Sequence, residues 1–206
     1  MVDAQLSRNA GPIALVAGSV FAAVDVVLFA LMDTDHRIEM LTDPTFRAFN
    51  AAYFFAFVGL AIGLVAVRAR HADRSGRLGT FGFLSALVGT MTQGGNMWFD
   101  GFAAPWLAEV VPHAFTAEKT TILLTGALLS YATFALGWAF FAFTSWRERT
   151  MPVGLAVAVA VGGVLGFQSG WPPYGVPIGL AVAAVGVWLI RADRAARVPA
   201  GAVTRP

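Results

Sequence analysis

Long apolar segments separated by short polar ones are the feature that most limits what this chain can fold into. The chain has 206 residues, of which 57% are hydrophobic and 13% are charged, and its mean hydropathy is +0.68. Apolar runs of about 20 residues are typical of transmembrane helices, because that length crosses the ~30 Å hydrocarbon core of a bilayer. Soluble domains carry about 25% charged residues, which is well above the fraction in this chain. Six such runs are present, at residues 11–32, 49–67, 78–100, 120–146, 151–169 and 176–190.

These runs predict an all-α fold, namely a polytopic membrane protein with a six-transmembrane-helix bundle. Residues 11–190 are expected to form one membrane domain, because no remaining tract is long enough for a second domain. Residues 1–10 form a short polar lead, and residues 191–206 form a basic tail. The first run is longer than the roughly 7–15 apolar residues of a secretory signal peptide, so we expect an uncleaved first helix.

The basic residues predict how the chain is threaded, because cytoplasmic loops carry an excess of Arg and Lys. If the six runs alternate in direction, eleven of the fourteen basic residues fall on one side of the membrane. That side is expected to be the cytoplasm and to hold both termini. Arg outnumbers Lys thirteen to one, a bias typical of GC-rich bacterial genomes, so the expected location is the bacterial inner (cytoplasmic) membrane. The eleven are Arg8, Arg68, Arg70, Arg74, Arg77, Arg147, Arg149, Arg191, Arg194, Arg197 and Arg205.

The third run carries a polar stripe. Small and polar side chains follow one another there at alternating steps of four and three residues, which places them on one helical face. Such a face is expected to contact neighbouring helices, whereas the larger apolar side chains around the rest of the helix are expected to contact lipid. The stripe consists of Gly82, Ala86, Gly89, Gln93, Asn96 and Asp100.

Polar residues inside the runs gather toward the side opposite the basic loops. At ~1.5 Å per residue, Asp25 lies about two-thirds of the way across the first helix. Asn50 and Tyr53 open the second helix at that same side, and Gln93 lies at a similar depth in the third. This asymmetry predicts a polar pocket that opens outward and is bounded by the first three helices and the fifth. The candidate ligand-binding residues are Asn50, Tyr53, Gln93, Asn96, Trp98 and Gln168.

Two acids, Asp25 and Asp100, are the candidate catalytic residues. A carboxylate in the hydrocarbon core costs from ~2.5 kcal/mol upward, so ionisable residues there usually face the bundle interior and have a function. Asp25 shares its helical face with Gly18, which indicates an interior direction. The alternative for Asp25 is a structural hydrogen bond, for instance to Tyr53 or Gln93. Asp100 could instead cap its helix at the water interface.

Other patterns exclude several classes of function. The chain has no Cys, which rules out disulfides and thiol chemistry. No His lies inside a run as a haem ligand would, no Lys is placed for a retinal Schiff base, and no nucleotide-binding loop is present, so no cofactor is expected. The loop Asp33–Glu39 could hold a divalent cation, but its spacing matches no metal motif, and a solvated acidic loop with no metal is the favoured interpretation. The basic residues flank the apolar runs, so the pI near 9.5 does not indicate a nucleic-acid partner.

The six-run layout, with an acidic first outer loop and a basic second loop, resembles that of small six-span membrane proteins common in actinobacteria. That resemblance implies no activity. A narrower stretch, Gly95–Asp100 (GNMWFD), is similar to the Asn-x-x-Trp-Glu stretch of small integral-membrane terpene cyclases. The similarity implies that Asp100, four residues after Asn96, donates a proton to an epoxide or alkene. The chain departs from that family because its Trp98 comes one place early, the usual seventh span is missing and the second acid is not found.

The observations are consistent with three kinds of function. The first is binding of a small amphiphilic, lipid or isoprenoid-like molecule in the outward pocket. The second is a membrane-embedded cyclase or isomerase that uses Asp100 or Asp25 as a general acid. The third is an accessory subunit, or a homo- or hetero-oligomer, whose glycine faces dock another membrane protein, since small residues let helices approach closely. The docking glycines would be Gly59, Gly63, Gly162 and Gly166.

Overall fold

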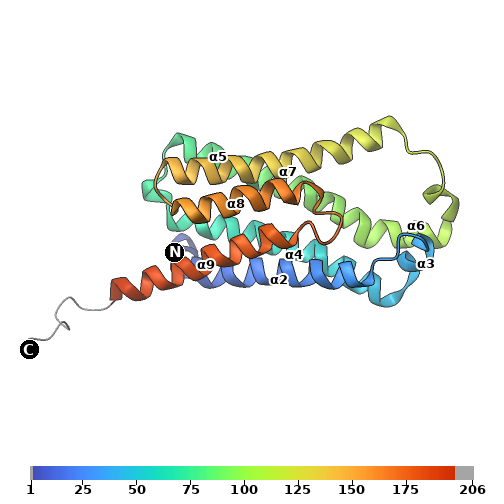
Figure 1. The fold of residues 1–206 in the computed structure, drawn as a ribbon, viewed down its shortest axis with the longest axis horizontal. Helices are drawn as coiled ribbons and strands as arrows, with labels where there is room; N and C mark the ends of the chain where they lie inside the picture. Colours follow the sequence, from blue (N-terminus) through green and yellow to red (C-terminus); the bar gives the residue numbers. More distant parts are fainter. Residues whose placement is uncertain (1, 198–206) are drawn as a thin grey trace, which may run out of the picture.

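The computed structural model describes residues 2–197, and all regular structure in this range is helical (Figure 1). The all-α prediction is therefore confirmed, and each of the six apolar runs contains one long helix. η2 is one π-helical turn, and η1, η3 and η4 are short 3-10 helices. The elements are α1 (Val2–Arg8), α2 (Ala10–Leu31), α3 (Arg37–Thr42), α4 (Pro44–Arg70), η1 (Ala72–Arg74), α5 (Arg77–Trp98), η2 (Phe99–Ala103), α6 (Ala104–Val110), η3 (Pro112–Phe115), α7 (Thr121–Arg147), α8 (Val153–Leu165), η4 (Gly166–Gln168) and α9 (Val176–Arg197).

The six long helices form a closed ring. α2 packs against α4, α4 against α5, α5 against α7, α7 against α8, α8 against α9, and α9 returns to α2. Neighbours in this ring run in opposite directions, as expected for helices joined by short connections (Figure 1). Buried aromatic side chains fill the centre, where Phe57 makes edge-on contacts with Phe21 and Phe134. Phe134 in turn packs at a tilt against Trp138. The ring therefore has a filled aromatic core and no central channel at this level.

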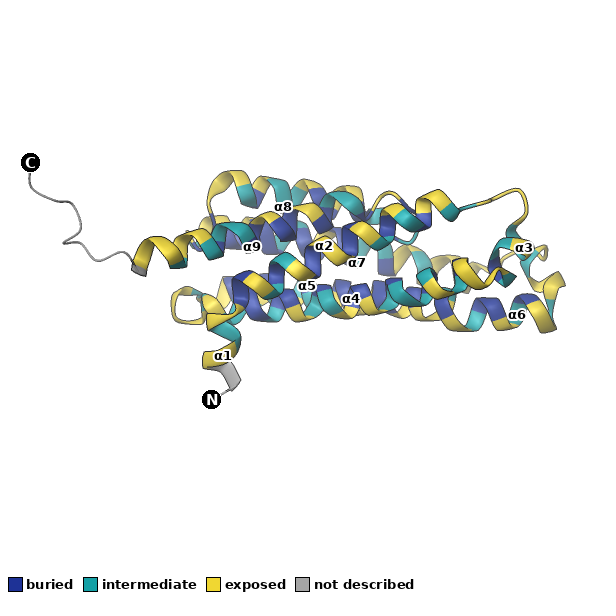
Figure 2. Cartoon of the chain, turned by 90° about the horizontal axis from the view of Figure 1, so that it is seen from below, coloured by how far each residue is buried: buried dark blue, intermediate teal, exposed yellow. Residues whose placement is uncertain are grey.

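The outer surface of the ring is apolar, as a lipid-facing surface would be. Figure 2 shows exposed positions along the outward faces of the helices and buried positions turned inward. Val16, Phe81, Met91 and Leu136 are each at least 60% exposed. By length and composition, α2, α4, α7 and the Val176–Ala196 part of α9 can cross a membrane. These features indicate a membrane protein, and the crossing of α5 and α8 remains a prediction.

Three of the helices, α4, α8 and α9, differ by more than two residues at an end from the runs that predicted them. α4 begins at Pro44 rather than at residue 49, because the carboxylate of Asp43 accepts hydrogen bonds from two N–H groups of its first turn. α8 covers 13 residues, Val153–Leu165, where the sequence predicts residues 151–169. At ~1.5 Å per residue α8 is about 20 Å long, which is shorter than the hydrocarbon core.

Glycine residues allow α2 and α9 to approach closely. A Cβ atom on Gly11 would lie 3.0 Å from the backbone nitrogen of Ile190. A Cβ atom on Gly18 or Gly186 would overlap the backbone of the facing helix. Since only glycine lacks a Cβ, these positions determine how deeply the two helices pack together.

The glycines predicted to dock a partner have different surroundings. A Cβ on Gly63 would meet Ala17, one on Gly162 would meet Ile178, and one on Gly166 would meet Phe134, all within this chain. Gly59, in contrast, has no atom within 4 Å of an added Cβ. Three of the four glycines are thus occupied by packing inside the bundle, and Gly59 is the one that faces open space.

The connections between helices form two different ends of the bundle (Figure 1). We call one the basic end: it consists of α1, residues 68–77, residues 147–152 and the last turns of α9. The other, the cavity end, consists of α3, η2, α6 and residues 166–175. The arginines predicted to share one side lie together at the basic end, except Arg205, which lies outside the described residues. Residues 191–197 of the predicted tail continue α9, and residues 198–206 also lie outside the described range.

Candidate functional site

Asp25 lies at a hydrogen-bonded junction between α2, α4 and the start of α9. Its side chain is fully buried. Its Oδ2 accepts hydrogen bonds from the backbone N–H groups of Gly175 and Val176, at 3.0 and 2.9 Å. Its Oδ1 accepts a hydrogen bond from the hydroxyl of Tyr53 at 2.6 Å. Asp25 therefore caps the N-terminus of α9 from a distant part of the sequence, and its hydrogen bond to Tyr53 is one of the two that the sequence left open.

The same junction fixes both ends of the segment Ser169–Gly175, which links η4 to α9. The hydroxyl of Tyr53 also lies 2.7 Å from the carbonyl oxygen of Ser169, at the start of the segment. At the other end, a Cβ on Gly175 would lie 2.9 Å from the ring of Phe21 and 3.1 Å from Cγ of Asp25. Because a larger residue would not fit, glycine is required for the chain to reach the carboxylate.

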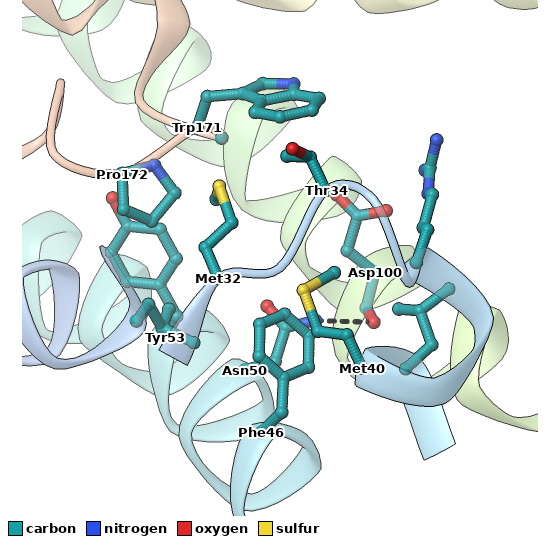
Figure 3. Close-up of a pocket in the computed structure, with 13 residues that line it drawn as sticks. Met32, Thr34, Met40, Phe46, Asn50, Tyr53, Asp100, Trp171 and Pro172 are labelled. Atoms are coloured by element: carbon teal, nitrogen blue, oxygen red, sulfur yellow. Dashed lines mark hydrogen bonds between the residues drawn. The ribbon is translucent and has the colours of Figure 1, made fainter. Parts of the chain in front are cut away.

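A cavity of about 170 Å³ lies beside this junction, at the cavity end of the bundle (Figure 3). Its walls come from the end of α2, from α3, from the first turns of α4, from η2 and from the Ser169–Gly175 segment. An engineered protein cavity of about 150 Å³ binds benzene, so this volume suits a group of that size. The lining residues are Leu28, Met32, Thr34, Arg37, Met40, Leu41, Phe46, Asn50, Tyr53, Asp100, Gly170, Trp171 and Pro172.

Asp100 lines the cavity from an irregular part of the helix. In the π turn η2, the N–H of Ala104 donates to the carbonyl of Phe99. The next residue, Pro105, has no N–H, so the carbonyl of Asp100 has no backbone donor. The side-chain nitrogen of Asn50 donates to that carbonyl instead, at 2.8 Å (Figure 3). This bond holds η2 against α4 and leaves the carboxylate of Asp100 on the cavity wall.

The carboxylate of Asp100 makes no hydrogen bond or ion pair with any residue in the described part of the chain. It points away from Asn50 in Figure 3. Arg37 also lines the cavity, and its guanidinium lies over the ring of Phe115, 5.5 Å from the ring centroid. That arrangement is a cation–π contact, which holds the positive charge at the edge of the cavity.

Asp33 and His36 close the loop at the rim of the cavity, on either side of the cavity-lining Thr34. Asp33 Oδ1 accepts hydrogen bonds from the N–H groups of Asp35 and His36, both at 3.1 Å. Asp33 Oδ2 lies 3.0 Å from Nδ1 of His36. The hydrogen bond from the His36 backbone is the main cause that lowers the pKa of Asp33, and the side-chain bond to Asp33 raises the pKa of His36. Both side chains are solvent-exposed.

The described residues contain no group of three or more His, Asp and Glu side chains that could hold a metal ion. In the loop Asp33–Glu39, the imidazole and the first carboxylate hydrogen-bond each other rather than converging with the other acids.

Four other predicted site residues do not line the cavity. Gln93 is fully buried, and its amide has no hydrogen-bond partner among the described residues. Asn96 donates a hydrogen bond to the hydroxyl of Ser130, on α7. Trp98 is 52% exposed, and Gln168 is exposed at the end of η4. The structure therefore brings Asn50, Tyr53 and Asp100 together on the cavity wall, and it leaves these four residues and Asp25 outside the cavity.

Several cavity residues were not among the candidates because they carry no charge or lie outside the apolar runs. Met32 is the uncharged last residue of the first run, Arg37 and Met40 belong to the connection between the first two runs, and Trp171 and Pro172 belong to another connection. One signal for Trp171 and Pro172 is present in the sequence. The segment GWPPYG, between two apolar runs, combines two prolines with two aromatic residues. A simple turn does not require the aromatic side chains, so their presence indicates a further role for the segment.

Comparison of the chain with protein-family models, with curated proteins and with solved structures gives no match. The chemistry of the site therefore follows from its own residues. It offers one carboxylate as an acceptor or acid, one cation at the rim, and aromatic and thioether surfaces for an apolar group.

Proposed function

We propose that this chain is a six-span protein of the bacterial inner membrane that binds a small amphiphile, such as a lipid or an isoprenoid-like molecule, in the cavity around Asp100. In this arrangement the basic end faces the cytoplasm, in keeping with the excess of Arg there, and the cavity faces outward. The observation that carries the proposal is that the carboxylate of Asp100 borders an apolar and aromatic cavity without a hydrogen-bond partner from the described chain.

The lining suits a molecule with one polar and one apolar part. Ligand sites are typically apolar with a few placed polar groups, and here Asp100 and Asn50 supply the polar groups. Drug-sized ligands occupy roughly 300–1,000 Å³, which exceeds the volume of this cavity. We therefore expect the cavity to enclose one end of the molecule. Trp171 lines the cavity and is 44% exposed. The rest of the bound molecule would therefore extend out of the cavity, past the Trp171 ring and toward the lipid.

A second candidate function, a membrane-embedded cyclase or isomerase, is favoured by the aromatic side chains beside Asp100. A neutral Asp100 would give its proton to an epoxide or alkene, and the faces of Phe46, Tyr53 and Trp171 would stabilise the cation that results. Asp25 is a less favoured candidate than Asp100 for the general acid. Its two oxygens already accept three hydrogen bonds, and it does not line the cavity.

Native mass spectrometry tests the binding proposal. The protein would be extracted gently from its own membrane, and the masses of the wild type, Asp100→Asn and Asp73→Asn would be compared. Asp100→Asn removes the charge from the cavity at almost constant volume. Asp73→Asn removes the same charge from an exposed position at the basic end. We expect a discrete small mass on the wild type and on Asp73→Asn, and its loss or marked depletion from Asp100→Asn.

The outcomes separate the candidate functions. A bare protein mass in all three samples, or a mass shared equally by all three, would remove the support for a ligand in this cavity. A bound second protein without a small molecule would instead support the accessory-subunit function. If a ligand is found, purified wild type and Asp100→Asn would be given that molecule and epoxidised isoprenoids. Turnover that is lost in Asp100→Asn would favour the enzyme, and binding without turnover would favour the binder.

A further inference from the structure

A second groove, with a volume of about 690 Å³, lies at the basic end, where α7 turns into α8. Two arginines and two tryptophans form much of its wall, and three apolar side chains complete it. This composition differs from that of the outer cavity, which contains one arginine and one carboxylate, since the groove contains two arginines and no carboxylate. The lining residues are Trp146, Arg147, Arg149, Met151, Pro152, Val153 and Trp188.

The positive charge of this groove is not neutralised by the acid that lies between the two arginines. Glu148 turns inward, where its Oε1 accepts hydrogen bonds from the N–H groups of Gly76 and Gly79 at the start of α5. Among the described residues, neither Arg147 nor Arg149 forms an ion pair with a carboxylate. The negative end of α7 and the positive end of α8 meet at the same turn and offset each other. The two guanidinium groups therefore set the sign of the local charge.

Arg149 occupies a backbone conformation that normally belongs to glycine. Its φ angle is 57°. The N–H of Arg149 donates to the carbonyl of Trp146, and the N–H of Thr150 donates to that of Ser145, which is the Schellman ending of a helix. Glycine or asparagine is usual at this position because other residues are strained there. The chain thus keeps an arginine at a position where glycine would be more stable, which points to a role for the side chain.

The tryptophans place the groove at the level of lipid headgroups, where indole rings are enriched. Trp146 is 49% exposed, and Trp188 stacks on His71 with ring centroids 6.0 Å apart. Burial lowers the pKa of His71, so this imidazole adds no charge near neutral pH. Phe143 and Val157, both about half exposed, continue the apolar surface from the groove along α7 and α8.

We propose that this groove binds the headgroup of an anionic phospholipid. The guanidinium groups of Arg147 and Arg149 would contact the phosphate, because guanidinium can form paired hydrogen bonds with phosphate oxygens. The acyl chains would follow the exposed surface that includes Phe143 and Val157. A zwitterionic lipid fits less well, since its ammonium group brings a second positive charge to the arginines. The proposal is independent of the amphiphile in the outer cavity.

The test is a lipid titration of delipidated protein in neutral detergent, with bound lipids counted by native mass spectrometry. Phosphatidylglycerol and phosphatidylcholine with the same acyl chains are compared. We expect tighter binding of phosphatidylglycerol to the wild type. The R147Q/R149Q variant should bind it roughly 30-fold more weakly, in line with the contribution of two basic residues near an anionic lipid. The R74Q/R77Q variant loses the same charge at the basic end, outside the groove, and should change the affinity much less, because solvent and salt screen charges that do not contact the lipid.

A third variant separates binding from folding. R149G relieves the backbone strain, so it should unfold at or above the wild-type temperature and still lose roughly fivefold in affinity for phosphatidylglycerol. Equal losses in the two double variants would assign the effect to general surface charge and overturn the site. Wild-type affinity in R149G, or full competition by inorganic phosphate at the concentration of the lipid, would also overturn it.

Discussion

At both ends of the bundle, a carboxylate from one helix accepts hydrogen bonds from the first N–H groups of another. At the cavity end, Asp25 on α2 binds the start of α9. At the basic end, Glu148 at the end of α7 binds the start of α5, with Oε1 accepting from Gly76 and Gly79 at 3.0 and 2.9 Å. Each bond joins helices that are far apart in the sequence, and each satisfies N–H groups that have no partner within their own helix.

Asp25 and Glu148 differ in how deeply they are buried and in how many hydrogen bonds they accept from the protein. Asp25 is fully buried in the middle of an apolar helix, and both of its oxygens are hydrogen-bonded by the protein. Glu148 is partly exposed, and its Oε2 has no partner among the described residues. Oε2 is itself buried, and Glu148 and Arg68 both line a cavity of about 10 Å³, which is space for about one water molecule. An acid far from water must be satisfied by the protein itself, whereas an acid near the surface can rely partly on solvent.

The largest expected effect comes from removing the interior acid. Asp25→Ala leaves the N–H groups of Gly175 and Val176 and the hydroxyl of Tyr53 without their acceptor, which should lower the free energy of unfolding by about 3–5 kcal/mol. Asp25→Asn keeps one acceptor oxygen and should cost about 1–2 kcal/mol. Unfolding of the purified protein in detergent, by heat or by SDS titration, measures the difference.

The matched control is Asp73→Ala, which removes an exposed acid at the basic end and should change stability by less than about 0.5 kcal/mol. If Asp25→Ala unfolded like this control, the junction at α9 would contribute nothing to stability, and the comparison of the two acids would fail.

The sequence predicts part of this junction, and the missing part has a physical cause. The cost of a carboxylate in hydrocarbon indicates that Asp25 faces inward, and Tyr53 is foreseen as a partner. The two N–H groups of Gly175 and Val176 are not foreseen, because a backbone donor has no side-chain signature and its partner lies 150 residues away in the chain. The six helices themselves are predictable for the opposite reason, since each is a local, continuous apolar run.

A second prediction tests whether the helices joined by Asp25 also depend on close packing. Gly18→Val places a side chain against the backbone of α9 and should lower stability by about 3 kcal/mol. Gly59→Val is the control, because a Cβ there meets no atom within 4 Å. It should change the free energy of unfolding by less than about 0.5 kcal/mol. The same detergent unfolding assay applies, and equal losses in both variants would show that the seam is not specially close-packed.

The residues that line the cavity could be predicted only in part from the separate apolar runs. Asn50, Tyr53 and Asp100 are predicted site residues, and they do share the cavity wall. Gln93 and Asn96 lie on the same predicted face as Asp100, yet they do not line it. Asn96 and Gln93 lie about one and two helical turns farther from the cavity end, at 3.6 residues per turn. A spacing argument places residues around a helix, but it does not predict how far a cavity extends along that helix.

A smaller effect is expected when the acid at the basic end is changed. Glu148→Gln keeps the size and one acceptor oxygen, and it removes the charge near the N-terminus of α5. The loss should be about 1 kcal/mol, because a charge at a helix N-terminus contributes roughly 0.3–1 kcal/mol and the hydrogen bonds weaken with it. The assay is again unfolding in detergent. A loss as large as that of Asp25→Ala would mean that nearness to water does not matter, and the distinction between the two ends would have to be abandoned.

The smallest expected effect concerns an acid that is fully in water, Asp33. Its bond to His36 raises the pKa of His36 and lowers that of Asp33. The contribution from His36 is therefore complete below its ordinary pKa and is lost as the pH rises through the raised value. The contribution from Asp33 is present above its ordinary pKa and is lost as the pH falls through the lowered value. The pair thus helps to stabilise the cavity rim at pH values between the lowered pKa of Asp33 and the raised pKa of His36, and added salt should weaken it.

NMR titration of the His36 ring measures the shift in its pKa. Asp33→Asn should return the pKa of His36 toward its ordinary value, and an unchanged titration would show that the pair does not form in solution.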